Sequence, residues 1–342
     1  MTVIAVVPGD GIGPEVTEEA VKVLDELQLG LEFDHLDDVN AETFRKTGAG
    51  LSPENFARIR SAKSVLFGAM GAPGINNSEY GRGVLIKMRF ELDLYVNHRP
   101  AFLWDARLSP LRDERRRNVD CVIVRENSEG LYVGVGGRIR PDTPEEIAID
   151  EDVNTYHGVS RVLEYAFSIA RKSVCLVDKS NAVPNGGALW QRCWRDAVER
   201  RPDIDCSHLF VDAAAMKLIA DPSAFDVIVT NNSYGDILSD LTAELAGGIG
   251  MAASANLNPK TGFGVYEPVH GSAPDIVGQG TANPVGAILS AALLCDGIGL
   301  PEAASAIRGA VSTAVSAGRC TPDIGGSLST REAGAAIRAE LR

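Results

Sequence analysis

Two aspartates four residues apart, Asp236 and Asp240, follow a short apolar run in the second half of the chain. The run, Phe225 to Thr230, is rich in β-branched residues and predicts a buried strand. Apolar residues then recur at helical spacing, with Asn232 or Ser233 as the expected N-cap, so the two carboxylates lie on one helix face. Carboxylates this close repel each other unless a cation or the helix dipole offsets their charge. The pattern therefore indicates either a solvated acidic helix start or an oxygen-ligand site for a hard divalent cation.

Three arginines stand beside predicted buried segments. Arg89 and Arg99 flank the second half of a helical stripe within Gly83 to Pro100, and Arg125 follows the predicted strand Val122 to Val124. A buried guanidinium is costly without an anionic partner, and it pairs bidentately with carboxylates. The arginines therefore indicate either a substrate that carries carboxylates or structural ion pairs with Asp and Glu.

Two further motifs could take part in chemistry. Lys179 follows the predicted strand Ser173 to Val177, and it is a candidate general base if its surroundings lower its pKa. The alternative is a lysine that simply leaves a strand. Near the start, Pro8 to Pro14 joins a strand to a helix with the spacing G-x-G-x-G. This is not the dinucleotide fingerprint G-x-G-x-x-G, so the spacing argues against a Rossmann fold.

Composition excludes several classes of protein. The 342 residues carry a net charge of -13 with no basic stripe, which argues against a nucleic-acid partner. No uncharged apolar run reaches ~18 residues, so we expect no membrane span. The start lacks a signal-peptide pattern, and the six cysteines form no CxxC pair, so we expect a cytoplasmic protein without disulfides or a zinc cage.

Strand and helix patterns alternate along most of the chain, which predicts an α/β fold. Within the helical stripe, the apolar positions run from Val84 to Tyr95. The segment Thr143 to His157 is acidic and indicates an exposed, strand-like excursion. Helices are expected from about Ser160 to Lys172 and from about Gly187 to Glu199.

Six motifs, taken together and in order, resemble the isocitrate/isopropylmalate dehydrogenases, a family of β-decarboxylating dehydrogenases. They are GDGIGPEV, LYVNHRP, VIVRENSEG, DKSN, GDILSD and EPVHGSAPDI. The resemblance implies a two-domain α/β/α fold with a mixed sheet. Residues 1–99 and 250–342 would form a dinucleotide-binding first domain, and residues 100–249 would form a second domain with a dimerisation arm at about 132–157. It also implies a homodimer whose subunits share their active sites.

The resemblance also assigns a role to each matching residue. Metal ligands would be Asp236 and Asp240 with Asp212 of the partner subunit. The catalytic residues would be Tyr132, Lys179 and Asp212, and the substrate would be held by Arg89, Arg99, Arg125, Leu85 and Asn181. The dinucleotide would lie against Ile12, His270, Gly271, Ser272, Ala273, Asp275 and Asn283.

The implied reaction is an NAD-dependent and Mg²⁺- or Mn²⁺-dependent oxidative decarboxylation of a small hydroxy-dicarboxylate. NAD is expected because the carboxylate of Asp275 accepts hydrogen bonds from a ribose diol and repels a 2′-phosphate. The run GVLIKMR with SANLNP is most similar to the tartrate/D-malate branch, and Gly81 and Ala182 replace the glutamate and valine usual in the leucine pathway. We therefore expect D-malate or tartrate as substrate. The alternatives are 3-isopropylmalate, a secondary-pathway homologue, or a catalytically silent regulatory subunit.

Overall fold

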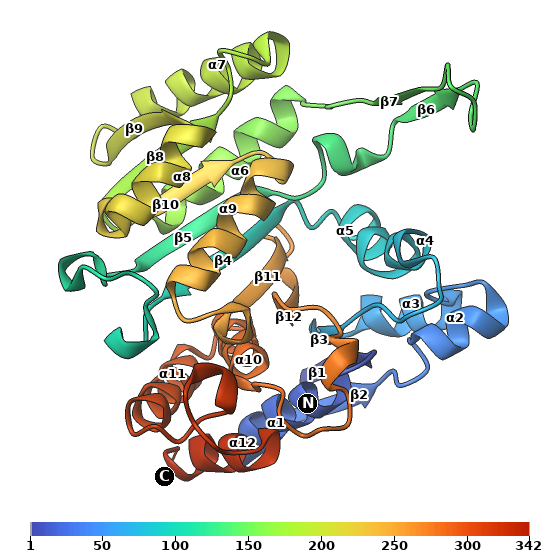
Figure 1. Cartoon of the computed structure of the whole chain (residues 1–342), viewed down its shortest axis with the longest axis vertical. Helices are drawn as coiled ribbons and strands as arrows, with labels where there is room; N and C mark the ends of the chain where they lie inside the picture. Colours follow the sequence, from blue (N-terminus) through green and yellow to red (C-terminus); the bar gives the residue numbers. More distant parts are fainter. Residues whose placement is uncertain (1, 342) are drawn as a thin grey trace.

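The computed structural model describes residues 2–341, and within them one large mixed sheet runs through the molecule (Figure 1). Its strand order is β2-β1-β3-β12-β11-β4-β5-β10-β8-β9, and β6 and β7 form a separate two-stranded sheet. The strands are β1 (Thr2–Gly9), β2 (Leu31–His35), β3 (Ser64–Ala69), β4 (Val96–Phe102), β5 (Asp120–Glu126), β6 (Gly136–Ile139), β7 (Ile147–Asp150), β8 (Ser173–Asp178), β9 (Asp205–Phe210), β10 (Val227–Thr230), β11 (Ala253–Asn258) and β12 (Phe263–Pro268). The helices are α1 (Gly13–Glu26), α2 (Ala41–Thr47), α3 (Pro53–Ser61), α4 (Asn77–Gly81), α5 (Lys87–Glu91), α6 (Tyr156–Ile169), α7 (Pro184–Arg200), α8 (Val211–Ala220), α9 (Asn232–Leu245), α10 (Val285–Gly297), α11 (Pro301–Ser316) and α12 (Thr330–Ala339).

The centre of the sheet is antiparallel and its two wings are parallel. β4 pairs antiparallel with both β5 and β11, and β11 pairs antiparallel with β12. The wing with β1, β2 and β3 comes from the first part of the chain, whereas β8, β9 and β10 come from its middle. β4 contains the expected boundary at residue 99 and hydrogen-bonds to strands on both sides, so the sheet continues across it. The division into two domains stays a prediction.

Apolar helix faces cover each wing. On one side, Val16 and Val23 of α1 share a buried cluster with Ile288 of α10, and α1, α10, α11 and α12 lie together at the lower end of Figure 1. On the other, Leu163 of α6 and Trp190 of α7 belong to a cluster that includes the β8 and β10 side chains. No helix within residues 2–341 has the length and apolar character needed to cross a membrane.

The helical stripe before β4 differs from its prediction. A π-helical turn, η1 (Arg82–Ile86), joins α4 to α5, and helix ends at Glu91. Asp93 then takes a left-handed backbone conformation with φ of 50°, which turns the chain into β4. Tyr95 therefore lies outside the helix, contrary to the apolar periodicity. It is buried beneath the guanidinium of Arg161, 4.0 Å from the ring centre.

Three helix starts were predicted at the wrong residue, each because a cap or proline acts earlier. Thr155 caps α6 by accepting a hydrogen bond from the Gly158 backbone, so His157 is helical rather than strand-like. Asn231, not Asn232 or Ser233, caps α9 through the Tyr234 backbone N–H. Likewise α7 begins at Pro184 rather than Gly187. Within the predicted excursion, β7 is confirmed as an exposed strand, and it pairs with β6 in a hairpin that projects from the molecule in Figure 1. β6 lies before the predicted segment.

Asp226 provides a test of how the β8–β10 wing is held. Its Oδ2 accepts hydrogen bonds from the backbone N–H groups of Arg171 (2.7 Å), Lys172 (2.7 Å) and Ser173 (3.2 Å), and its Oδ1 accepts one from Arg171 Nε (2.9 Å). Burial alone would raise the pKa of Asp226, but these donors outweigh it and the pKa is lowered. We expect Asp226→Asn to lower the free energy of unfolding by about 2–3 kcal/mol at pH 7, because it leaves buried donors unmatched.

A lowered folded-state pKa means that this stabilisation is present above the unfolded pKa of about 3.9 and is lost as the pH falls through the folded value. The difference between wild type and Asp226→Asn, measured by urea unfolding, should therefore shrink below about pH 4. Asp203→Asn, at an exposed ion pair with Arg201, is the matched control and should change the unfolding free energy much less. An equal loss in both variants would contradict this role for Asp226.

Candidate active site

Helix α9 places Asp236 and Asp240 beside two arginines from the central strands. Arg125, at the end of β5, forms an ion pair and hydrogen bond with Asp236 Oδ1. Nη1 of Arg99 on β4 lies 3.4 Å from the Oδ1 atoms of both Asp236 and Asp240. The aspartate side chains are 38% and 58% exposed, so each carboxylate keeps an open side. Partial burial and the Asp236 charge raise the pKa of Asp240, and the Arg99 and Arg125 charges oppose that rise. The guanidinium groups therefore offset part of the repulsion within the acidic pair.

Arg125 is the most deeply buried of the three predicted substrate arginines, with 3% of its side chain exposed. Burial, reinforced by the nearby Arg89 and Arg99 charges, lowers its pKa to about 9. Asn232 Oδ1 accepts hydrogen bonds from both Nε (2.8 Å) and Nη2 (2.6 Å) of Arg125. A Cβ added to Gly235 would lie 2.6 Å from Arg125 Cβ, so the helix must carry glycine there. The sequence suggested only an N-cap role for Asn232.

The third predicted substrate arginine, Arg89 on α5, faces Glu267 of β12. Its Nη2 lies 3.7 Å from Glu267 Oε1, and both side chains are nearly buried. Burial lowers the pKa of Arg89, and the Glu267 carboxylate opposes that change. Leu85, one helical turn earlier, is half-buried against the apolar cluster of the β1–β3 wing. Glu267 escaped prediction although it opens the motif EPVHGSAPDI.

Tyr132 joins the same group of side chains. It lies in a 3₁₀ turn, η4 (Leu131–Val133), at the base of the β6–β7 hairpin. Its hydroxyl donates to Asp236 Oδ2 at 3.2 Å, and the Arg125 guanidinium lies 5.5 Å from its ring centre. Partial burial, together with the Asp236 charge, raises the pKa of Tyr132. A proton donor thus sits beside the acidic pair.

Lys179 and Asp212 form a separate pair. Lys179 follows β8 and Asp212 begins α8, and Lys179 Nζ lies 2.7 Å from Asp212 Oδ1. The hydrogen bond from Lys179 lowers the pKa of Asp212. Asn181 is exposed beside Lys179. Within residues 2–341 no three His, Cys, Asp or Glu side chains gather to hold a metal ion, so one chain does not bring Asp212 to Asp236 and Asp240.

The predicted dinucleotide segment lies against the glycine-rich turn after β1. The Ile12 N–H donates to the Ser272 carbonyl at 2.9 Å, and a Cβ on Gly11 would lie 2.0 Å from that same oxygen. A cavity of about 580 Å³ runs beside this contact and is lined by residues 70–73, by Tyr80 and Gly81 and by residues 271–274. His270 Nε2 is buried without a hydrogen-bond partner, and burial lowers the pKa of His270. The geometry thus offers a groove, and His270, whose Nε2 is unpaired, directly precedes its lining residue Gly271.

The last two residues predicted to bind the dinucleotide, Asp275 and Asn283, differ in whether their side chains are free to bind a ligand. Asp275 is exposed at the start of a 3₁₀ turn, η7 (Pro274–Ile276). Asn283 is already engaged: its Nδ2 donates to Asp323 Oδ2 at 2.9 Å and its Oδ1 accepts from the Val285 N–H at 3.0 Å. Asn283 therefore has a structural role at the start of α10.

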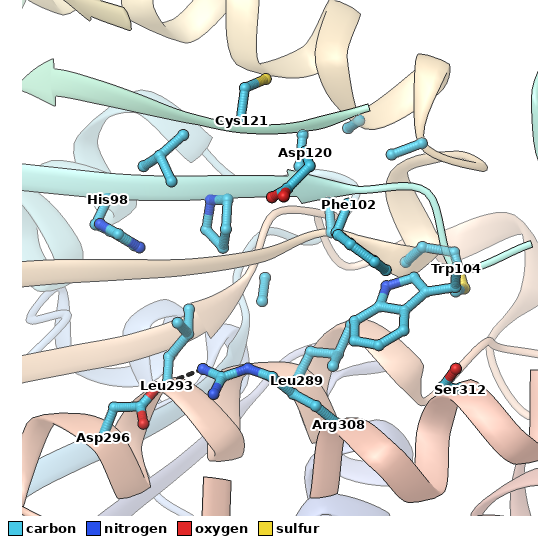
Figure 2. Close-up of a pocket in the computed structure, with 18 of the residues that line it drawn as sticks. His98, Phe102, Trp104, Asp120, Cys121, Leu289, Leu293, Asp296, Arg308 and Ser312 are labelled. Atoms are coloured by element: carbon cyan, nitrogen blue, oxygen red, sulfur yellow. Dashed lines mark hydrogen bonds and ion pairs between the residues drawn. The ribbon is translucent and has the colours of Figure 1, made fainter. Parts of the chain in front are cut away.

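A larger cavity, about 680 Å³, lies on the opposite face of β4 (Figure 2). Side chains alternate along a strand, so His98 and Pro100 line this cavity while Arg99 between them reaches α9. Its walls are mostly apolar and include Phe102, Trp104 and Leu289. None of the predicted catalytic, substrate-binding, metal-binding or dinucleotide-binding residues lines it, so it is separate from the candidate site.

The comparisons with known proteins agree with this geometry. The model of the isocitrate/isopropylmalate dehydrogenase family matches residues 3–337. The 3-isopropylmalate dehydrogenase of Beutenbergia cavernae is 45% identical over 97% of this chain and 98% of its own length, and that of Corynebacterium glutamicum is 46% identical over 97% of each. An isocitrate dehydrogenase from Methylococcus capsulatus is similar in structure, with a TM-score of 0.91, 36% identity and all of both chains covered. A β-decarboxylating dehydrogenase from Thermococcus kodakarensis has a TM-score of 0.82 and 36% identity over 100% of this chain and 96% of that one.

These similarities confirm the resemblance seen in the six motifs and the α/β fold with a mixed sheet. The same family assignment follows from the order of the motifs along the chain. The proximity of three arginines to an acidic pair also agrees with it. The chain belongs to the isocitrate/isopropylmalate dehydrogenase family and is an NAD-dependent β-decarboxylating dehydrogenase that uses a divalent metal such as Mg²⁺ or Mn²⁺.

Proposed function

We propose that this enzyme oxidises and decarboxylates a 3-substituted malate, and that 3-isopropylmalate is the first substrate to test. The observation that carries the proposal is the proximity of three arginines: Arg99 and Arg125 pair with Asp236, and the Arg89 and Arg99 charges both act on Arg125. Three guanidinium groups suit a substrate with two carboxylates better than a monocarboxylate. The relatives are 3-isopropylmalate dehydrogenases, which favours that alternative over the D-malate or tartrate that we expected first. Leu85 supplies an apolar contact for the C3 group.

The donor set fits a hard divalent ion. Asp236 and Asp240 offer carboxylate oxygens on their open sides, and Asp212 of a second chain would supply a third ligand. When bound, the metal supplies Lewis-acid polarisation of the substrate hydroxyl, and NAD supplies the hydride acceptor for C2. Residues 270–275 would hold the dinucleotide, with His270 Nε2 available as a hydrogen-bonding atom.

The remaining chemistry falls to protein side chains. Lys179 of a second chain takes the proton of the C2 hydroxyl as the carbonyl forms. The C3 carboxylate of the resulting β-keto acid leaves as CO₂, and its bonding electrons pass to C3. Tyr132 then protonates C3, and its hydrogen bond to Asp236 fixes its position. Arg99 and Arg125 hold the two carboxylates until the C3 carboxylate leaves as CO₂.

A second copy of the chain is part of this proposal. Large apolar side chains are exposed on the β6–β7 hairpin and on α8 and α9, namely Val135, Ile139, Ile147, Ile149, Met216, Ile219 and Ile237. Exposed apolar groups on neighbouring elements are typical of an obligate interface. A homodimer through these elements would bring Lys179 and Asp212 to the partner's acidic pair. The dimer, the domain division and a cytoplasmic location all remain proposals.

A substrate panel tests the function directly. We expect metal-dependent NADH formation with 3-isopropylmalate, and a kcat/KM at least about 10-fold below it for D-malate and tartrate, because these lack the apolar C3 group. The measurement is NADH absorbance with Mg²⁺ or Mn²⁺ supplied. Turnover of D-malate above 3-isopropylmalate would restore the tartrate/D-malate assignment. Lack of turnover with any 3-substituted malate would favour the silent regulatory subunit.

The acidic pair can be tested separately from turnover. We expect Asp236→Asn to weaken Mn²⁺ binding by roughly 10–100-fold in calorimetry, because one anionic ligand is lost. It should also lower the melting temperature, since Arg125 keeps its charge in a buried position without a counter-ion. Asp296→Asn, which removes the ion-pair partner of Arg308 beside the opposite cavity, is the control. Equal Mn²⁺ affinity in wild type and Asp236→Asn would contradict the proposed ligand role.

Cofactor choice depends on Asp275. We expect Asp275→Lys to move the NADP/NAD ratio of kcat/KM toward NADP by at least about 10-fold, because a cation replaces a carboxylate that repels the 2′-phosphate. Asp275 is exposed, so the substitution should leave the fold intact. Glu302→Lys is the control, because Glu302 is exposed on α11. Asp323→Lys is unsuitable because Asp323 accepts a hydrogen bond from Asn283. An unchanged ratio would rule out this role for Asp275.

A further inference from the structure

A ladder of buried polar side chains crosses the middle of the sheet on the face that carries Arg99. Asn97 on β4 and Asn256 on β11 are cross-strand partners, and neither has any exposed surface. Asn127 follows β5, and Glu267 stands on the neighbouring strand β12. Figure 1 shows these four strands side by side at the centre of the molecule. Burying several amides is costly unless they satisfy one another. Here the amide N–H groups have partners, whereas the Oδ1 atoms of Asn97 and Asn127 have none.

Asn256 is the hub of this ladder. Its Oδ1 accepts hydrogen bonds from Asn97 Nδ2 at 3.1 Å and from Asn127 Nδ2 at 3.0 Å. Its Nδ2 donates to Glu267 Oε1 at 2.7 Å and lies 3.4 Å from the Val265 carbonyl. The N–H donors of Asn97 and Asn127 thus fix the position of Asn256 Oδ1. As a result, Asn256 Nδ2 faces Glu267. The amide cannot turn over without losing both bonds to Oδ1.

Glu267 in turn faces Arg89 at a distance longer than a normal hydrogen bond. Arg89 Nη2 lies 3.7 Å from Glu267 Oε1, near the outer limit of an ion pair. The same Oε1 is the atom that Asn256 holds. The carboxylate therefore offsets the charge of a buried guanidinium while leaving its N–H donors free. Arg89 Nε is indeed buried with no partner.

Free donors are what a substrate arginine needs. A carboxylate that closed fully on Arg89 would occupy the N–H groups that the substrate has to reach, and it would compete with the substrate for them. The hydrogen bond from Asn256 Nδ2 restrains Glu267 Oε1 and so opposes movement of this carboxylate toward Arg89. We call this bond the tether. The same bond also holds β11 and β12 in register beside the site.

We propose that Asn256 is a positioning residue that holds the Glu267 carboxylate back from Arg89. The Arg89 guanidinium then remains available to the malate substrate, and in this respect the inference rests on the proposed function. Asn256 touches neither substrate nor cofactor. It acts through Glu267 on the affinity for one ligand, the dicarboxylate. Loss of the tether should therefore appear in the KM for malate and not in the KM for NAD.

Asn256→Leu, which keeps the shape and removes the amide, is the test. We expect the KM for the 3-substituted malate to rise roughly 10-fold or more, because Glu267 then closes on Arg89, with kcat and the KM for NAD within about 3-fold of wild type. Adding Glu267→Gln should restore most of the malate affinity, since the competing charge is gone. This rescue by a second substitution distinguishes a tether from general damage.

Asn258→Leu is the matched control on the same strand. Asn258 is also buried, but its Oδ1 accepts from the Lys260 and Thr261 backbones at the β11–β12 turn, away from Glu267. It should lower the melting temperature without a selective change in the malate KM. Equal effects of Asn256→Leu and Asn258→Leu, or additive losses in the Asn256→Leu/Glu267→Gln double variant, would overturn the inference. Asn256→Ser replaces Asn256→Leu if the latter does not fold.

A crystallographic measurement keeps the test independent of turnover. In the Asn256→Leu variant we expect a Glu267 oxygen to approach an Arg89 nitrogen to about 2.8–3.2 Å, the range of a normal hydrogen bond. An unchanged separation relative to the wild-type crystal structure would overturn the tether. If the wild-type enzyme turns over no 3-substituted malate, the proposed function fails, and this distance still decides the role of Asn256.

Discussion

The ion pair between Arg125 and Asp236 is the interaction on which the site depends. The Arg125 guanidinium, near the end of a central strand, is almost wholly out of water, and the Asp236 carboxylate of α9 offsets the cost of burying its charge. Gly235 lets the two elements approach, and Asn232 takes up the remaining donors. Tyr132 and Arg99 then gather on the same aspartate. Side chains predicted to bind metal or substrate, or to catalyse the reaction, thus come from distant parts of the sequence and meet at Asp236.

Much of this arrangement could be read from the sequence. Short β-branched runs and helical apolar stripes predict the alternation of strands and helices, because burial on a sheet or helix face repeats every two or 3.6 residues. The i, i+4 spacing of Asp236 and Asp240 predicts a shared helix face, which α9 shows. Arg125 was identified by its place after a buried strand, and Arg89 and Arg99 by their place beside the second half of the helical stripe. Each of these inferences needs only local sequence.

What escaped prediction depends on contacts between distant residues. Nothing local to Glu267 or Asn256 indicates that they meet each other or Arg89, since their pairing follows from the antiparallel register of β11 and β12. Tyr95 looked helical because apolar spacing cannot show where Asp93 turns the chain. The helix starts shifted because the cap residue, not the apolar period, sets the first turn. The motifs also did not determine which malate binds, since Gly81 has no side chain and Ala182 has only a methyl group with which to contact a substrate.

The alternation along β4 restricts how this chain can change. Arg99 must point to α9, whereas His98 and Pro100 on either side face the opposite cavity. Because neighbouring residues of a strand point to opposite faces, inserting or deleting a single residue there would send the guanidinium to the wrong side. Evolutionary change within β4 is therefore confined to substitutions. The length of the strand is fixed because Arg99 must stay on one face and the cavity-lining residues on the other.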